Sequence, residues 1–178
     1  MALILSDFPT RLDESIPLFA ADGSLPPGDF LPNRSEFENR FVYAGDTGRR
    51  GSIYDGWNRH RNALILAGVA PSGWQLLNGS FTTAKDSPVD IDIAVEVQIE
   101  SDTLLHITPS DPIVRLLQGP ATKPVYSCDA YPIYSLPARD PLYDSVTKAA
   151  IEYWTKWFGR TRAGTQKGRV WAKNGGLA

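Results

Sequence analysis

The 178-residue sequence predicts one α+β domain in which helices flank a mixed β-sheet. Three observations lead to this class. Helical patterns fill the first third of the chain, alternating and β-branched segments fill the middle, and a long apolar-faced helix with a short strand ends it. The length suits a single domain over residues 1–178 with a sizeable core. We see no internal repeat and no low-complexity tract.

The N-terminal part predicts two helices behind an irregular arm. Ser35 with Glu38 three residues later forms a capping box, which starts the first helix. Gly68 is a natural stop for the second. The expected elements are, in order, an irregular arm (1–33), a short helix (35–43), a loop (44–51) and a longer helix (52–67).

The middle of the chain carries the strand signals. Residues 89–98 alternate with period two, which predicts a strand with one apolar side and one mostly polar side. Pro132 breaks the last strand of this part or marks a sheet edge. The expected elements are a buried strand (74–78), a turn with one helical turn (79–85), a strand (89–98), a short strand (104–108), a short helix (111–118) and a strand (122–136).

The C-terminal part predicts a long helix and a final strand. Asp140-Pro141 is a strong helix start, and the helix should run to Phe158. A last short strand is expected over residues 167–172, and the tail from residue 174 should be loose. The apolar side of the helix would comprise Leu142, Val146, Ala149, Ala150, Tyr153, Trp154 and Trp157.

Composition excludes several classes of protein. The net charge of −2 argues against a chain that is basic as a whole and binds nucleic acid through its net charge. No apolar run approaches the ~20 residues that span a bilayer, and the N-terminus lacks a basic segment typical of signal peptides. The single cysteine, Cys128, allows no internal disulfide. We therefore expect a soluble cytoplasmic protein without a membrane partner.

Charge is unevenly distributed along the chain. Every charged residue between Asp86 and Asp111 is acidic, and every one between Lys156 and Lys173 is basic. One interpretation is two solvated surfaces of opposite sign. The other is an acidic metal-binding centre beside a phosphate-binding wall, which the basic C-terminal extension (159–178) would supply.

Two carboxylates stand on one side of the alternating strand. Asp90 and Asp92 project in the same direction, roughly 7 Å apart at the backbone. One interpretation is that both are solvated. The other is that a bound cation relieves their repulsion, and Mg²⁺ prefers carboxylate and phosphate oxygens. The turn Gly79-Ser80 precedes them. Its glycine allows close backbone approach to a phosphate, and its serine adds a hydroxyl.

The pattern Gly79-Ser80, nine residues, then Asp90-Ile91-Asp92 resembles the signature of the polymerase-β-like nucleotidyltransferase superfamily. The whole chain resembles a small, uncharacterised bacterial group of that superfamily. The matching segments are LPPGDF (25–30), SEFENRFV (35–42), the Arg49-Arg50 region, the GSF…DID core and YWTKWFGRTRAGTQKGRV (153–170). The resemblance implies a nucleotidyltransferase-like mixed sheet and a third carboxylate on a later strand, for which Asp129 is the candidate.

The resemblance also implies roles for individual residues. Asp90 and Asp92 would bind two Mg²⁺ or Mn²⁺ ions, and Asp129 would bind the ion on the side of the attacking hydroxyl. Gly79 and Ser80 would hold the β- and γ-phosphates. The candidates for neutralising phosphates of the nucleotide or of an RNA acceptor are Lys85, Arg160, Arg162, Lys167 and Arg169.

The implied activity is metal-dependent transfer of a nucleoside monophosphate from a nucleoside triphosphate, for example ATP, to a hydroxyl on RNA, protein or a small molecule. The lack of an evident acceptor-recognition domain argues for a partner protein, as in a toxin–antitoxin or phage-defence setting. One alternative is a catalytically inactive regulatory or interaction protein of the same fold, similar to an antitoxin. Another is an RNA-binding module that uses the basic C-terminal extension. Isolated His60 and His106 give no zinc site, and neither a P-loop nor a dinucleotide-binding motif is present.

Overall fold

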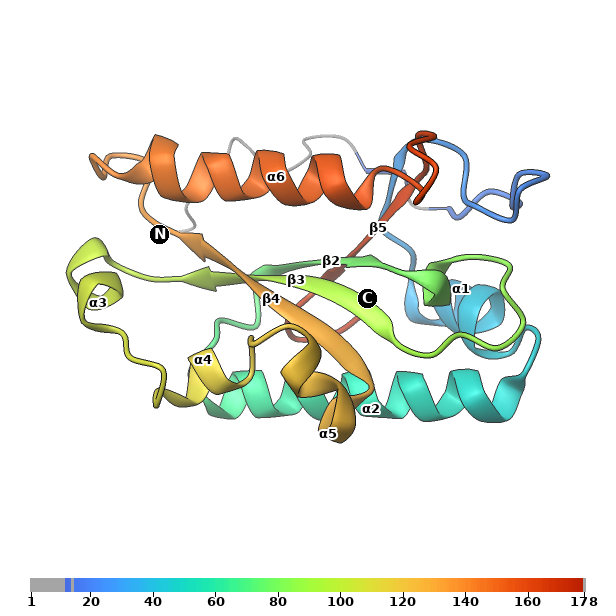
Figure 1. Ribbon diagram of the computed structural model, residues 1–178, viewed down its shortest axis with the longest axis horizontal. Coiled ribbons are helices and arrows are strands. Elements are labelled where there is room, and N and C mark those ends of the chain that lie inside the picture. The colour runs from blue at the N-terminus through green and yellow to red at the C-terminus, as the bar shows by residue number, and fades with distance from the viewer. Residues whose placement is uncertain (1–11, 14, 178) are drawn as a thin grey trace.

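The computed structural model describes residues 12–13 and 15–177, and its centre is a mixed sheet with strand order β1-β5-β2-β3-β4. Helices lie on both faces of this sheet (Figure 1). The predicted α+β class with a mixed sheet flanked by helices is therefore confirmed. The strands are β1 (Asp29–Phe30), β2 (Trp74–Asn78), β3 (Ile91–Gln98), β4 (Cys128–Ser135) and β5 (Arg169–Lys173).

Helical segments of three kinds connect the strands. The α-helices are α1 (Arg34–Phe37), α2 (Thr47–Leu66), α3 (Ser101–His106), α4 (Pro112–Arg115), α5 (Lys123–Tyr126) and α6 (Ala149–Phe158). The π-helical segments are η1 (Glu38–Val42) and η4 (Asp144–Lys148), and the 3₁₀ segments are η2 (Ser80–Thr82) and η3 (Pro120–Thr122). Across residues 12–13 and 15–177, no helix is both long and apolar enough to cross a membrane.

Strand pairing brings three polar residues onto one face of the sheet. β2 runs antiparallel to β3, and β3 runs parallel to β4. In this register Asn78 lies opposite Asp92, and Asp92 lies opposite Asp129. Residues directly opposite each other on neighbouring strands point to the same side. The three side chains therefore lie in a row across β2, β3 and β4.

The sheet is the middle of three layers, with α2 on one face and α6 on the other (Figure 1). Each face has its own apolar core. On the α2 face, Ile53, Trp57 and Leu64 pack in one buried cluster with alternate residues of β3. On the α6 face, Ile151 and Phe158 belong to a second buried cluster.

The mostly polar side of β3 is buried in the middle of the strand, because α6 packs over it. Ala94 is fully buried in the α6-side core, and Glu96 is only 1% exposed. The Glu96 carboxylate accepts a hydrogen bond from the Trp74 backbone N–H at 2.9 Å. Burial raises its pKa. Within β3, Asp92 at the start is partly exposed and Gln98 at the end is exposed, while the residues between them are buried.

The N-terminal helices begin earlier than the sequence predicts. The cap of α1 is Asn33, whose side chain accepts from the Glu36 backbone N–H at 2.9 Å, and not Ser35. Glu38 does not close the expected capping box because it binds Arg34 and Tyr54. The longer helix α2 starts at Thr47 rather than at residue 52, because the Asp46 side chain accepts from the Arg49 N–H. Asparagine and aspartate are strong caps, and they decide both starts.

The predicted strand over residues 104–108 is wrong, and so is the first part of the strand predicted over 122–136. The structure has α3 at Ser101–His106, and α5 precedes β4. The reason is topological: β3 and β4 pair directly and in parallel, so the chain between them must cross over, and helices form such crossovers. Because β4 lies at the sheet edge, it tolerates Pro132, as predicted.

The predicted apolar side of the C-terminal helix is rotated. Tyr153 and Trp157, expected in the core, are 56% and 65% exposed, whereas Ile151 and Phe158 are buried. The offset begins ahead of α6, since Tyr143 and Thr147 are buried while Leu142 is 38% exposed, so the buried side is shifted by one residue, or about 100°, along the whole helical segment. Gly159 caps the end of α6, as expected.

The chain ends are tied into the sheet more firmly than the sequence suggests. The predicted irregular arm contains β1, which pairs in parallel with β5. The tail from residue 174 is not loose. Asn174 is 1% exposed, and its side-chain amide donates to the carbonyls of Ala70 and Glu96. Residues 1–11 and 14 of the arm lie outside the described residues.

A buried arginine fixes the loop that follows β2. Arg50 on α2 is 1% exposed. Its guanidinium donates to the carbonyls of Phe41 at 2.8 Å, Phe81 at 2.9 Å and Thr83 at 2.9 Å, and also to that of Lys85. Arginine is suited to this role because it presents five donors in a rigid plane. The loop after Gly79 is therefore clamped to α2.

Replacing Arg50 with methionine should lower the free energy of unfolding by about 3 kcal/mol or more, because several buried carbonyls lose their donors. The matched control is the exposed Arg59→Met on the same helix, which should change it by less than about 0.5 kcal/mol. Urea unfolding followed by tryptophan fluorescence measures both. Equal losses in the two variants would contradict the clamp.

Candidate active site at the ends of three strands

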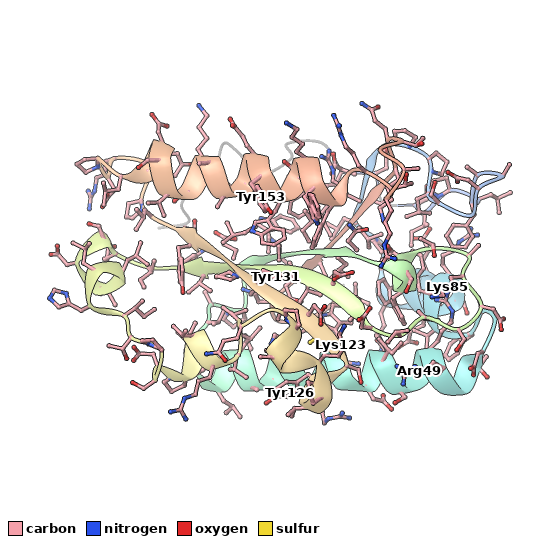
Figure 2. All side chains as sticks on the ribbon, in the orientation of Figure 1. Arg49, Lys85, Lys123, Tyr126, Tyr131 and Tyr153 are labelled. Carbon is pink, nitrogen blue, oxygen red and sulfur yellow. The ribbon has the colours of Figure 1, made fainter. Side chains whose placement is uncertain are left out.

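Three carboxylates form one cluster at the start of β3 and β4. Asp92 is directly opposite Asp129, and Asp90 lies one residue before β3. The ammonium of Lys123, which is labelled in Figure 2, contacts Oδ2 of Asp90 and lies 3.2 Å from Oδ2 of Asp129. The structure thus brings together all three acidic residues singled out from the sequence. We call Asp90, Asp92 and Asp129 the carboxylate cluster.

The cluster is electrostatically strained. Burial first, and then the negative charges of Asp90 and Asp129, raise the pKa of Asp92 to about 6, against the opposing effect of Lys123 and Lys167. Burial also raises the pKa of Asp129, against the opposing effect of Lys123. Cations that compensate the cluster would therefore stabilise its ionised form.

Two oxygens at the cluster lack hydrogen-bond partners. Within the described part of the chain, Oδ1 of Asp129 and Oδ1 of Asn78 are both buried and unpaired. The two residues are 8% and 7% exposed, and both lie opposite Asp92 on neighbouring strands. Buried polar atoms normally have partners, so these two oxygens are available to accept from, or coordinate, a group bound at the cluster.

The turn after β2 meets the cluster directly. Gly79 has φ of 83°, and a Cβ at this position would lie 2.3 Å from Oδ2 of Asp92. Only glycine fits this conformation and this space. Ser80 then begins η2, and its carbonyl accepts from Oγ1 of Thr83 at 2.7 Å. The predicted pair Gly79-Ser80 is thus packed beside Asp92.

Among the predicted phosphate-binding cations, Lys167 is the one whose charge acts on the pKa of Asp92. Its side chain is half-buried just before β5, and burial lowers its pKa while the charge of Asp92 raises it. A pocket of about 250 Å³ adjoins it, lined in part by Lys156, Arg160 and Gln166. This pocket is basic and of a size that a phosphate group could enter.

The other predicted cations are placed differently. Arg160 and Arg162 are exposed in the segment after α6, and Arg160 reaches the pocket beside Lys167. Arg169 forms a two-pronged ion pair with Asp29 at 2.6 and 2.7 Å, so it holds β1 to β5. Lys85 is exposed in the loop clamped by Arg50, away from Lys123 (Figure 2).

Sequence reasoning missed three residues of the site. Lys123 falls in a segment predicted to be a strand, and Asn78 was regarded only as the end of one. Tyr131, two residues after Asp129, has its pKa raised first by burial and then by the charges of Asp129 and Asp92. Its ring packs on Trp154 with centroids 4.6 Å apart. Period-two spacing from Asp129 was the available signal for Tyr131.

Residues 12–13 and 15–177 contain no group of three His, Cys, Asp or Glu side chains already arranged around a metal position. The space between Asp90 and Asp129 holds the Lys123 ammonium instead. The donor atoms are nonetheless carboxylate and amide oxygens, which Mg²⁺ prefers, and two of them are unpaired. The predicted metal set of Asp90, Asp92 and Asp129 stays a prediction that the donor chemistry fits.

A family model described as a family of unknown function, DUF6932, matches residues 17–173. The chain belongs to the DUF6932 family. The carboxylate cluster, Gly79, Lys123 and Lys167 all lie inside the DUF6932 match. No curated protein and no solved structure matches the chain. Membership of DUF6932 carries no activity with it, so a function must be argued from the site.

Replacing Gly79 with alanine should destabilise the protein more than the strained backbone alone explains. Gly164 is the matched control, since its φ of 86° is similar and a Cβ there would meet nothing within 4 Å. We expect a loss of about 1 kcal/mol for Gly164→Ala and about 2–4 kcal/mol for Gly79→Ala, which must also push Asp92 aside. Urea unfolding compares them. Losses of the same size would show that the Asp92 side chain can move away from a Cβ at position 79 without cost.

Replacing Asp92 with asparagine should stabilise the protein at neutral pH. Because folding raises the pKa of Asp92 from 3.8 to about 6, the ionised form costs stability above pH 6, by up to about 3 kcal/mol. As the pH falls toward 3.8 the carboxyl becomes protonated in the folded state and then in the unfolded state, so the cost shrinks to about 0.6 kcal/mol at pH 4. Urea unfolding at pH 7.5 and pH 4 measures the difference between wild type and Asp92→Asn.

The gain from Asp92→Asn should therefore be full at pH 7.5 and reduced to about a fifth of that value at pH 4. Asp55→Asn, at an exposed position of α2, serves as the control and should change the free energy of unfolding little at either pH. A gain from Asp92→Asn that is the same at both pH values would contradict the strain in the cluster.

Proposed function

We propose that this DUF6932 protein is a magnesium-dependent nucleotidyltransferase. It would move a nucleoside monophosphate from a nucleoside triphosphate to a hydroxyl group. The observation that carries this proposal is the row of Asn78, Asp92 and Asp129 with two unpaired buried oxygens, beside Asp90 and the Gly79 turn. Clustered carboxylates beside a glycine turn and a basic pocket suit phosphoryl transfer, in which catalysis is mainly positioning and charge neutralisation.

The strand arrangement supports the proposal. β2 runs into Gly79-Ser80, the antiparallel neighbour β3 carries Asp92, and the parallel neighbour β4 carries the third carboxylate. This is the order that the resemblance to the polymerase-β-like superfamily implies. A nucleotidyltransferase-like fold is accordingly part of the proposal.

The residues present fit a divalent cation. Asp90, Asp92 and Asp129 would hold it, with the amide oxygen of Asn78 as a further neighbouring donor. Bound there, Mg²⁺ or Mn²⁺ would neutralise the carboxylates and the phosphates and would favour deprotonation of the attacking hydroxyl. The raised pKa of Asp92 supports this, because the cluster lacks full compensation.

The chain's own groups would then position the reactants. Gly79 leaves space for the triphosphate to approach the backbone, and Lys167 with Arg160 would bind phosphate oxygens from the basic pocket. Oδ1 of Asp129, which lacks a protein partner, would accept a hydrogen bond from the acceptor hydroxyl. That hydroxyl oxygen would bond to the α-phosphorus as the bond to the pyrophosphate oxygen breaks.

The acceptor and the setting belong to the same proposal. RNA is an acceptor class that exposed Tyr153 and Trp157 favour, because aromatic rings stack with unpaired bases. A protein hydroxyl or a small molecule would use the same carboxylates. We place the reaction in the cytoplasm, where nucleotides are available and where the buried Cys128 stays reduced.

A second candidate is a catalytically inactive regulatory protein with the same fold. One observation favours it: Lys123 already pairs with Asp90 and Asp129. A site permanently filled by its own lysine would bind neither metal nor nucleotide. Such a protein would act through a partner, in the manner of an antitoxin.

Label transfer tests the proposal. The protein would be incubated with each α-labelled nucleoside triphosphate, Mg²⁺ or Mn²⁺, and total cellular RNA and protein. We expect label in one macromolecular fraction and a loss of at least about 100-fold in Asp92→Asn and Asp129→Asn. The control is Asp102→Asn, exposed on α3 and outside the cluster, which should keep full transfer. Transfer that survives in both cluster variants, or binding of neither metal nor nucleotide, would contradict the proposal.

A further inference from the structure

Lys123 occupies the position that a bridging cation would take. Its ammonium contacts one oxygen of Asp90 and lies 3.2 Å from one oxygen of Asp129. On the Asp129 carboxylate this leaves only Oδ1 without a partner. The lysine is therefore placed between two of the three residues that the metal site requires.

The backbone of Lys123 is held in place from both sides. Oγ1 of Thr122 donates to the Cys128 carbonyl at 2.7 Å and accepts from the Ala130 N–H at 3.2 Å, which fixes the preceding residue to β4. The carbonyl of Lys123 itself accepts from the Ser127 N–H at 2.8 Å. These backbone contacts therefore direct the Lys123 side chain toward the carboxylate cluster.

The side chain of Lys123, in contrast, has space to move its ammonium away from the two carboxylates. It is 36% exposed, so solvent reaches it. Lysine has a flexible four-carbon stem that ends in a compact charge, and it can move its ammonium by several ångströms without moving the backbone. The anchored backbone and the mobile side chain together allow exchange of one cation for another.

Charge and space forbid both cations from binding at once. With all three carboxylates ionised, Lys123 and Lys167 compensate the cluster except for a single negative charge. A divalent ion added beside an unmoved Lys123 would meet an ammonium at contact distance and would make the cluster positive. Like charges this close repel strongly in a partly buried site.

We propose that Lys123 is the internal counter-cation of the carboxylate cluster, which a divalent metal ion must displace from Asp90 and Asp129 in order to bind. This rests on the metal site of the proposed function, and not on the transfer reaction. The cluster stays assembled without metal because Lys123 holds two of its members. The displaced ammonium would be available to the phosphates of a metal-bound nucleotide, which would favour binding of metal and nucleotide together over metal alone.

The first test is the affinity for Mn²⁺ alone, measured by electron paramagnetic resonance without nucleotide. Lys123→Met should bind Mn²⁺ about tenfold more tightly than wild type or better, because the competitor is gone. Lys167→Met is the matched control: it removes the same charge beside Asp92 but vacates no bridging position. Its gain should be several-fold smaller. Equal gains, or no gain in Lys123→Met, would overturn the inference.

The second test uses the wild-type protein, so it stands even if Lys123→Met does not fold. An amine-reactive reagent with mass spectrometry measures the labelling rate of Lys123 with and without saturating Mn²⁺. We expect labelling of Lys123 to rise by about threefold or more on metal binding, while exposed Lys85 stays constant. Lys123 that remains protected at saturating Mn²⁺ would overturn the inference.

The two proposals fail separately. Label transfer with an unmoved Lys123 would remove only the counter-cation role. Displacement of Lys123 by Mn²⁺ without transfer to any fraction would uphold this inference and remove the transfer reaction.

Discussion

The parallel pairing of β3 with β4 is the constraint on which the rest of the structure depends. Its register sets Asp92 directly opposite Asp129. Two buried carboxylates at neighbouring positions repel each other, and nothing in a sheet requires them there. The surrounding features then follow: Lys123 crosses from α5 to compensate two of the cluster's acids, Lys167 faces the third, and the pKa of Asp92 stays raised in spite of both.

Much of the remaining structure keeps this unfavourable arrangement in place. Arg50 ties the loop after β2 to α2, and Gly79 adopts a positive φ so that the chain can pass Asp92. Burial of apolar side chains in the cores on both faces of the sheet offsets the destabilising effect of the cluster. Sites that store strain or repulsion are commonly functional, and this distribution of favourable and unfavourable regions agrees with a ligand-binding role for the cluster.

Patterns local in sequence predicted the parts of the fold that local interactions determine. Alternation identified β3, the apolar run identified β2, and the spacing after Gly79 singled out Asp90 and Asp92. Long-range effects explain the failures. The rotated face of α6 depends on its packing against the sheet in the second core, and the helix α3 depends on the parallel crossover. The sequence pattern does not predict Lys123 as a site residue, because it meets Asp90 and Asp129 only when α5 folds over the strand ends.

The central claim is that the carboxylate cluster holds divalent metal with nucleotide. A crystal structure with Mn²⁺ and a non-hydrolysable nucleoside triphosphate analogue, recorded for anomalous scattering, tests it most directly. The account predicts a manganese peak about 2.1 Å from carboxylate oxygens of Asp92 and Asp129, with triphosphate oxygens completing its coordination. A cluster that binds no manganese at millimolar concentration, with Lys123 still bridging Asp90 and Asp129, would contradict the account.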